Sequence, residues 1–266
     1  MLALLADGLL TSRLGRVNGF ELTAPGENMH VPYGLEIIED CQACRLQKNS
    51  FFCNLPAGST KAIDDAKYTN AYPSGALLFV EGQAARGIWI LCKGQAKLTT
   101  TSPEGKTVIV RIAQAGELLG LQATLSGEPY ELTAQTLEPC QVAFLRKDDF
   151  LKLIREHPEA CERALRELSH YYKDAFHQIR FLGLSKSATE KLARFLVQYS
   201  TRGHQTDQGI RFTLGLTHEE IAQIVGVSRE TVTRSLTELK EKTIIAVHGS
   251  SVVIRDKAGL LQLAAA

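Results

Sequence analysis

The stretch THEEIAQIVGVSRETVTRSLTEL occupies residues 217–239 and combines two helix starts with one sharp turn. Thr217 followed by Glu220 is a capping box, in which each side chain accepts a hydrogen bond from the other residue's backbone amide, so a helix should begin there. Gly226 comes where that helix must stop, because glycine adopts a positive φ at low cost. Ser228 then suits the N-cap of a second helix. We therefore predict two helices joined by a tight turn.

The second of these helices has an apolar face and a polar one. Val232, Leu236 and Leu239 recur at helical spacing and should pack on the first helix. Arginine bonds guanine in a bidentate manner, glutamate accepts from cytosine, and hydroxyls at a helix start suit phosphates. A plain helical hairpin with a solvated face is the alternative, but the order of cap, glycine and charges favours a helix that reads DNA. The residues predicted to contact DNA are Ser228, Arg229, Glu230, Thr231, Thr233 and Arg234.

Two β-rich runs follow the second helix. Residues 244–247 and 252–254 flank Gly249 and Ser250, which is a hairpin signal. A hairpin at this point makes the unit a winged helix-turn-helix.

Upstream, the sequence from Tyr72 to Leu145 is typical of a sandwich or barrel. Short strand-like runs are separated by turn residues at regular spacing, which is the pattern of such folds. The predicted strands are 77–80, 88–92, 96–101, 107–112, 131–136 and 141–145. Residues 1–40 show no sustained period, and we expect a poorly ordered tail.

Between the two regions the apolar period changes to steps of four and three. Such a heptad seam is typical of a helix that packs along a partner helix, and it can also pack on the chain's own barrel. Its length and regularity favour dimerisation. The seam begins at Cys161, and the predicted dimer contacts are Leu165, Leu168, Tyr172, Ala175, Ile179 and Leu182.

Composition narrows the classes of protein that remain. The chain has 266 residues, 44% hydrophobic and 22% charged, with a net charge of +1, which fits about two ordinary globular domains. No apolar run is long enough to span a bilayer, and no export signal is evident, so we expect a cytoplasmic chain with reduced cysteines. The predicted barrel contains no histidine, which argues against a metal-dependent oxygenase, and no nucleophile elbow or phosphate loop is present. We therefore do not expect an enzyme.

Taken in order, these parts resemble the Crp/Fnr family of the cAMP receptor protein and the fumarate–nitrate regulator. The most specific match is VGVSRETVTR (225–234), and the barrel segments VEGQAARGIWILCKGQAKL (80–98) and GELLGL (116–121) are similar to that family's hairpin and later turn. The resemblance implies that Arg229, Glu230 and Arg234 read a TGTGA-like half-site in an inverted repeat. It also implies double-stranded DNA, a second copy of the chain and RNA polymerase as partners, and no membrane.

The same resemblance bears on cofactors. The family's nucleotide pocket uses a Glu and an Arg-Ser pair, whereas this chain has Leu121 after Gly120 and Tyr130-Glu131 near the pair's positions, so we expect no cAMP binding. Cys41, Cys44 and Cys53 are similar to the cysteine cluster of fumarate–nitrate regulators, and an iron–sulfur cluster is implied.

The family's barrel cysteine corresponds to Ala143, however, and Cys140 should point to the opposite face of its strand. Cys92 is another candidate ligand. A zinc site, a thiol switch and inert cysteines remain alternatives to a cluster for Cys41, Cys44 and Cys53.

The predicted fold is α+β, with a cyclic-nucleotide-binding-like β-barrel (jelly roll), a long dimerisation helix and a C-terminal winged helix-turn-helix. The expected domains are a tail over 1–40, a sensor barrel with the cysteines over 41–155, the dimerisation helix over 156–184, and the DNA-binding domain over 185–266. We expect the barrel to sense a signal and shift the helix seam, which moves the recognition helices.

Overall fold

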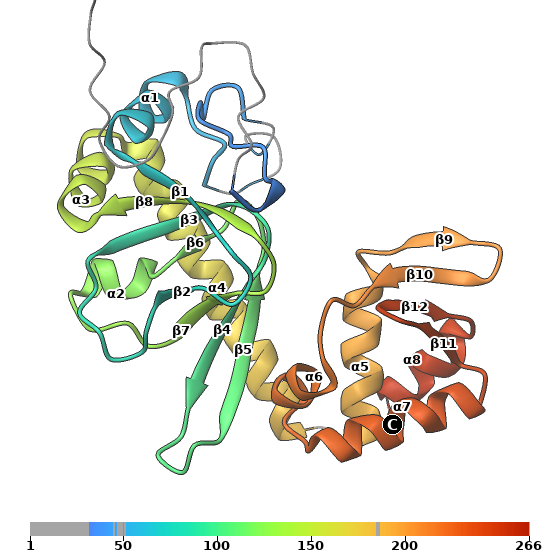
Figure 1. Ribbon diagram of the computed structural model, residues 1–266. Coiled ribbons are helices and arrows are strands. Elements are labelled where there is room, and N and C mark those ends of the chain that lie inside the picture. Colours follow the sequence, from blue (N-terminus) through green and yellow to red (C-terminus); the bar gives the residue numbers. More distant parts are fainter. Residues whose placement is uncertain (1–31, 45, 47–49, 51, 185–186, 266) are drawn as a thin grey trace, which may run out of the picture.

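The structure is a computed structural model that describes residues 32–265 except 45, 47–49, 51, 185 and 186. A larger β-rich domain and a smaller C-terminal domain are joined by the long helix α4 (Figure 1). This is the α+β arrangement that the sequence predicts. No helix in the described ranges combines the length and the apolar character needed to cross a membrane.

Two four-stranded antiparallel sheets form the β-rich domain, in the orders β1-β8-β3-β6 and β2-β7-β4-β5. One apolar core fills the space between the sheets and another lies between the first sheet and the helices α1, α3 and α4. The strands are β1 (Tyr68–Tyr72), β2 (Leu77–Phe79), β3 (Gly87–Lys93), β4 (Ala96–Thr101), β5 (Thr107–Ala113), β6 (Leu118–Leu119), β7 (Thr133–Thr136) and β8 (Cys140–Arg146).

All six predicted barrel strands are present, and two were missed. β1 is a half-exposed strand of sequence YTNAY, without the alternation of apolar and polar residues on which a strand prediction depends. β6 has only two residues and is defined by its pairing with Trp89 and Ile90 on β3. Both strands are therefore defined by their pairing with strands that are distant in sequence.

The helices divide between covering the barrel and building the C-terminal domain. α4 is 27 residues long and starts at Pro158, a residue that suits the first turn of a helix. The short helix η1 (Pro32–Gly34) precedes α1 (Ala57–Ala66), α2 (Leu121–Ser126), α3 (Lys147–Glu156), α4 (Pro158–Leu184), α5 (Ala188–Ser200), α6 (His218–Val225), α7 (Arg229–Glu241) and α8 (Lys257–Ala265).

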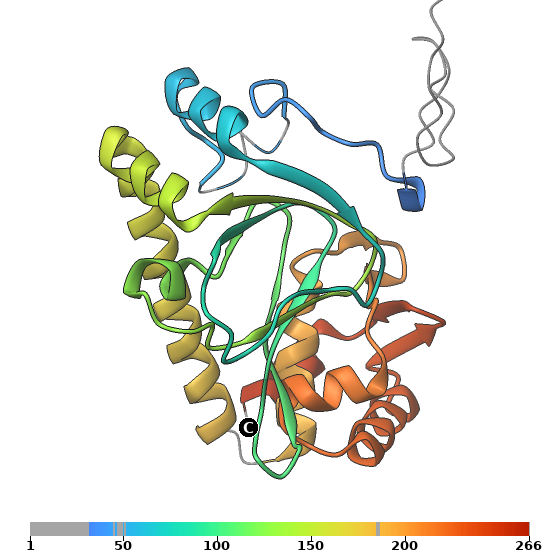
Figure 2. The same cartoon turned by 60° about the vertical axis from the view of Figure 1, so that its left-hand side comes forward.

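The C-terminal domain packs its helices on a third sheet, of order β11-β12-β10-β9. Its core is continuous from α5 through α6 and α7 to the sheet. The strands are β9 (His204–Thr206), β10 (Gly209–Thr213), β11 (Ile245–His248) and β12 (Ser251–Ile254). The β4–β5 hairpin extends from the barrel toward this domain in both views (Figures 1 and 2), and β5 contacts α6.

Part of the expected N-terminal tail is held against the barrel. The backbone amide of Ile38 donates to the buried Gln141 side chain at 2.8 Å, and the Gln141 amide donates back to the Ile38 carbonyl at 2.6 Å. This reciprocal pairing joins residues that are 103 positions apart, so periodicity in the sequence could not reveal it. Residues 1–31 of the expected tail lie outside the described residues.

Candidate nucleic-acid interface

The start of α6 and the turn after it have the predicted local geometry. Thr217 and Glu220 form the full capping box, with the Glu220 amide donating to Thr217 Oγ1 at 3.2 Å and the Thr217 amide donating to Glu220 Oε2 at 3.0 Å. Gly226 ends the helix with φ 69° and ψ 40°, a left-handed conformation that only glycine adopts cheaply. The direction in which the chain enters α7 is therefore set by residues 217–226.

The start of α7 is capped as expected. The Ser228 Oγ atom accepts from the Thr231 amide at 3.2 Å and lies 3.0 Å from the Thr231 hydroxyl. Val232, Leu236 and Leu239 are buried in the domain core. The cap and this buried face together determine which side chains of α7 face solvent.

The exposed side of α7 carries the four predicted base-contacting residues Arg229, Glu230, Thr233 and Arg234. No ion pair ties up either arginine within the described part of the chain. Hydrogen bonds from its own backbone amide and from Ser228 lower the pKa of Glu230, so this carboxylate stays ionised and can accept from a base. Two cationic groups and one anionic group are thus presented together.

Thr233 is less free than the sequence indicates. Its Oγ1 atom donates to the Arg229 carbonyl at 3.0 Å and lies 2.9 Å from Nδ1 of His218. His218 is the first residue of α6 and was not predicted to belong to this surface. A histidine at that position carries no signal by itself, because only the packing of the two helices brings it to Thr233.

The hairpin after α7 is present as predicted. β11 pairs with β12 from Ile245–Ile254 to His248–Ser251, which makes the unit a winged helix-turn-helix. Of the nearby basic residues, Lys242 is paired with Glu238 at 2.7 Å, whereas His248 and Arg255 are exposed. Exposed basic groups on the wing or just after it are suited to phosphate contacts.

The predicted dimer seam divides into two faces of α4. Leu168 is half-buried and packs against the barrel core beside Ala160, Ala164 and Tyr171, and its part in the dimer seam stays a prediction. An exposed apolar stripe remains, formed by Leu165, Tyr172, Phe176 and Ile179 at 61, 68, 50 and 67% exposure. Phe176 was missed because it follows Ala175, which occupies the heptad position.

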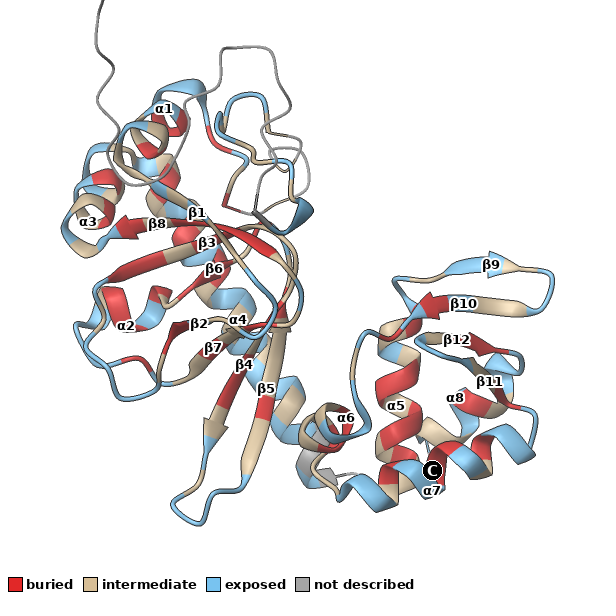
Figure 3. Ribbon diagram, in the orientation of Figure 1, coloured by how far each residue is buried: buried red, intermediate tan, exposed pale blue. Residues whose placement is uncertain are grey.

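Of the other predicted seam residues, Ala175 is exposed, and the side chain of Leu182 lies outside the described residues. Among the α4 residues whose burial is described, Glu167 is the last buried one, and residues 172–180 are exposed or half-buried in this single chain (Figure 3). An exposed apolar stripe on a long helix is the surface expected of a helix that packs on a partner.

Aromatic side chains fill the barrel interior where a cyclic nucleotide would need a cation. Tyr130 is 4% exposed, stacks on Phe79 with ring centroids 4.2 Å apart, and donates its hydroxyl to the Gly87 carbonyl at 2.8 Å. Leu121 is also buried. These groups offer a phosphate diester neither charge nor a free donor, which supports the expectation that cAMP is not the ligand.

Three cysteines pack against the barrel core at the N-terminal end. Cys41, Cys53 and Cys92 contact the same apolar cluster, and burial raises the pKa of these thiols to about 12, 11 and 12. Cys41 Sγ accepts from Lys67 Nζ at 3.0 Å, and Lys67 is itself paired with Asp64. The thiols are therefore protonated near neutral pH in this arrangement.

A metal or iron–sulfur cluster needs thiolates that converge on one point. Among the described residues no group of three or more His, Cys, Asp or Glu side chains is arranged to hold a metal. Cys41, Cys44 and Cys53 all lie close enough to Cys92 to raise the pKa of its thiol, and their assignment as metal ligands remains a prediction.

A buried polar network joins the barrel to α4. The Tyr171 hydroxyl lies within hydrogen-bond distance of both the Leu118 carbonyl and Glu167, which share its one proton, and Glu167 is 1% exposed. The Arg111 guanidinium lies 4.3 Å from the centre of the Tyr171 ring and also binds Glu117. The network connects β5 and the turn before β6 to two adjacent turns of α4.

Two known domain families match this chain. The cyclic nucleotide-binding domain matches residues 69–157, and the Crp-like helix-turn-helix domain matches residues 190–263. The two matched ranges correspond to the barrel and to the C-terminal domain, and α4 lies between them.

Proteins similar to this chain include transcription regulators. A CRP-like cAMP-activated global transcriptional regulator of Mycobacterium tuberculosis is 28% identical over 194 residues, covering 73% of this chain and 86% of that protein. The transcriptional activator protein FnrA of Stutzerimonas stutzeri is 28% identical over 232 residues, covering 84% and 92%. The structure of FixK2 from Bradyrhizobium japonicum has the same fold, with a TM-score of 0.67, 21% identity and coverage of 75% and 98%.

Proposed function

The chain belongs to the Crp/Fnr family of DNA-binding transcription regulators and is not an enzyme, and from this premise we propose that it binds an inverted repeat of TGTGA-like half-sites as a homodimer. One observation carries the proposal. The capped start of α7 exposes Arg229, Glu230 and Arg234 together, and neither arginine has an ion pair in the described chain.

Each of these residues has a specific part in the proposed readout. The two arginines bond the O6 and N7 atoms of guanine, and the ionised Glu230 accepts from the N4 amino group of cytosine. Thr233, braced by His218, packs beside them, and the hydroxyls of Ser228 and Thr231 lie at the helix start, where backbone amides attract phosphate. The phosphate contacts fix the register, and the three charged side chains read the sequence.

The homodimer forms through the exposed stripe of α4. Leu165, Tyr172, Phe176 and Ile179 pack against the same residues of a second copy, an arrangement with two-fold symmetry. The two recognition helices then face half-sites about one helical turn apart, roughly 34–36 Å along the DNA. An inverted repeat follows because the two-fold axis of the protein must coincide with that of the DNA.

Control by a signal uses the contacts between the barrel and the remaining parts. The network of Arg111, Glu167 and Tyr171 connects the barrel to α4, so a change in the barrel alters the packing of the dimer helix. The regulator acts in the cytoplasm, where it meets promoter DNA and RNA polymerase. A signal molecule changes the DNA affinity only to the extent that it binds the two arrangements of the dimer with different affinities.

A binding titration tests the proposal. The full chain is titrated at fixed salt into a labelled duplex that holds a TGTGA inverted repeat, and into a scrambled duplex of the same composition. We expect tighter binding to the repeat, and Arg229→Ala or Arg234→Ala should each weaken that specific binding by about 1–3 kcal/mol. Arg211→Ala, an exposed arginine on β10, is the matched control and should leave the preference unchanged.

A selection of bound sequences from a random DNA pool, carried out with and without oxygen, tests the proposed DNA site without assuming its base sequence. Enrichment of an inverted repeat with half-sites about one turn apart supports the proposal. Equal binding to the repeat and the scrambled duplex, together with no enriched sequence, overturns it.

A further inference from the structure

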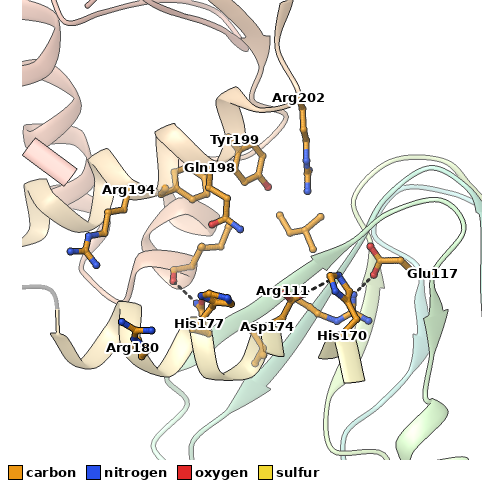
Figure 4. A pocket seen from close by; sticks show the side chains of 15 residues that line it. Arg111, Glu117, His170, Asp174, His177, Arg180, Arg194, Gln198, Tyr199 and Arg202 are labelled. Atoms are coloured by element: carbon orange, nitrogen blue, oxygen red, sulfur yellow. Dashed lines mark hydrogen bonds and ion pairs between the residues drawn. The ribbon is translucent and has the colours of Figure 1, made fainter. Parts of the chain in front are cut away.

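A cavity of about 810 Å³ lies between the barrel, α4 and the DNA-binding domain (Figure 4). β5 of the barrel forms one wall, the C-terminal half of α4 another, and α5 the third. Its volume is within the range of about 300–1,000 Å³ typical of sites for small molecules, and such sites occur preferentially between domains. The cavity is separate from the aromatic interior of the barrel and from the recognition helix.

The lining of this cavity is cationic. It includes four arginines and two carboxylates. Arg111 binds Glu117, and Arg194 binds Glu190 at 2.8 Å and the Ala264 carbonyl. Asp174 lies 3.5 Å from His170. Glu117 is therefore paired with an arginine and Asp174 lies beside an imidazole, and these two carboxylates leave part of the charge of the four arginines uncompensated.

The guanidinium groups of two lining arginines are available to bind an anionic ligand. Arg180 on α4 and Arg202 just after α5 have no ion pair among the residues that the structure describes. Arg202 lies with its guanidinium 5.0 Å from the centre of the Tyr199 ring. Figure 4 shows Arg202 and Tyr199 reaching from one side toward the wall that carries Arg111 and His170. The two unpaired charges thus come from different elements.

A buried hydroxyl in the wall has no acceptor for its proton. The Tyr199 hydroxyl has no acceptor within the described structure, and the Arg202 guanidinium beside it can only donate to its oxygen. Burial raises the pKa of this phenol, so it keeps its proton and can donate. Buried hydroxyls nearly always have a partner, and an unsatisfied one beside a cavity calls for a ligand or a water molecule. The amide of Gln198 is next to it in the lining.

We propose that this interdomain cavity binds a small organic oxyanion, a carboxylate or phosphate metabolite, through Arg180, Arg202 and the Tyr199 hydroxyl. Guanidinium groups bind both kinds of oxyanion in a bidentate manner, and a neutral phenol adds a donor that a cation would not need. On α4 the lining residues His170, Asp174 and His177 lie nearly opposite the exposed apolar stripe, at about 100° per residue, whereas Arg180 lies about 40° from Phe176. Dimerisation through that stripe therefore leaves the His170 side of the cavity open and places Arg180 at the rim nearer the second copy.

Occupation of the cavity couples to DNA binding, and this part rests on the proposed function. The ligand would touch the barrel, α4 and α5 at once, so it favours one orientation of the DNA-binding domain over others. By linkage, the same ligand must bind more tightly or more weakly when DNA is present, by the factor with which it changes the DNA affinity.

Calorimetric titration of the full chain without DNA tests the site. Citrate represents carboxylates and ATP represents phosphates, each at the same ionic strength set with chloride. We expect saturable binding of at least one probe, weakened at least about tenfold by Arg202→Ala or Arg180→Ala and less by Tyr199→Phe. Arg86→Ala, an exposed arginine on the barrel, should bind as the unchanged chain does.

The outcomes separate the two proposals. Absence of binding with both probes, or binding that the Arg180→Ala/Arg202→Ala double variant retains in full, overturns the cavity as an oxyanion site. Circular dichroism of each variant establishes that it is folded. If the probe binds while no DNA preference is found, the proposed function fails and the cavity stands. If DNA is recognised and the probes do not bind, the cavity fails as an oxyanion site and the proposed function stands.

Discussion

Lys97 Nζ on β4 lies 2.8 Å from Glu220 Oε1 in α6, and this ion pair fastens the barrel to the first helix of the helix-turn-helix. Both side chains are less than a fifth exposed, at 18 and 15%, so solvent screens the pair only partly. Glu220 also closes the capping box with Thr217. One carboxylate thus starts α6 and holds the DNA-binding domain in place.

Lys97→Met should loosen this attachment. The substitution keeps the length of the side chain but leaves Glu220 without its cation, which we expect to cost about 1–2 kcal/mol, between the values for exposed and buried pairs. Hydrogen exchange followed by mass spectrometry should be faster in peptides from β4 and α6. Lys106→Met, in the exposed turn after β4, is the matched control; equal exchange in both variants would contradict the prediction.

The pH dependence of hydrogen exchange tests the same contact between Lys97 and Glu220. Burial opposes ionisation of Glu220, but hydrogen bonds from Lys97 and Thr217 outweigh it and lower the pKa below 4.5. A carboxyl with a lowered pKa stabilises the folded state above the unfolded pKa, and this stabilisation is lost as the pH falls through the folded pKa. The difference in exchange between the unchanged chain and Lys97→Met should therefore shrink in acid.

The Ser228 side chain has separable roles in stability and in DNA binding. Ser228→Ala removes the N-cap of α7 and should lower the free energy of unfolding by about 1 kcal/mol. Ser228→Asp keeps a capping oxygen, so its stability in urea should match that of the unchanged chain. It also places a negative charge where a phosphate is expected, so DNA binding should weaken. If Asp leaves the DNA affinity unchanged, Ser228 does not face the phosphate.

Ile179 lies in the exposed stripe of α4, and Ile179→Glu should disrupt the dimer. A carboxylate in the middle of an apolar interface loses its hydration without gaining a partner, so the variant should become monomeric at micromolar concentration. Sedimentation velocity measures the change. Lys173→Glu alters the charge on the same helix away from the stripe and should remain dimeric. A dimer with Ile179→Glu would place the interface elsewhere.

Tyr171→Phe removes one hydroxyl from the network between barrel and α4. Glu167 then keeps only the long hydrogen bond from the Leu118 amide, at 3.5 Å, inside a buried site, which should lower the free energy of unfolding by about 1–3 kcal/mol. Burial already raises the pKa of Glu167 above 4.5, so this residue costs stability as the pH rises from 4.5 through the folded pKa. The penalty of Tyr171→Phe, measured by urea unfolding, should therefore be larger at pH 8 than at pH 5.

The cysteines give a test of the metal prediction. Because burial raises the pKa of Cys41, Cys53 and Cys92 to about 12, 11 and 12, the metal-free folded chain should react slowly with iodoacetamide at pH 8 and quickly after unfolding. Anaerobic purification followed by iron, sulfide and zinc analysis decides the alternative. Stoichiometric metal that is lost in Cys41→Ser would show that the loop rearranges to bring the thiolates together.

Sequence alone determined the elements that depend on neighbours within about four residues. Thr217 with Glu220, Gly226, and Ser228 with Thr231 are local pairs or local backbone conformations, so the two helices and their turn could be predicted with the correct exposed face. The barrel strands in the middle of each sheet were predicted for the same reason, because alternation and turn residues are local signals.

Only the tertiary structure decided which of two faces a residue serves and which distant residues meet. The period of α4 does not distinguish the face that packs on the barrel, where Leu168 lies, from the exposed stripe with Phe176. Lys97 meets Glu220 across 123 residues, and the cavity near Tyr199 is lined by residues of β5, α4, α5 and α6. Such contacts follow from packing of whole elements, because free energy is gained by burying surfaces that no single stretch of sequence contains.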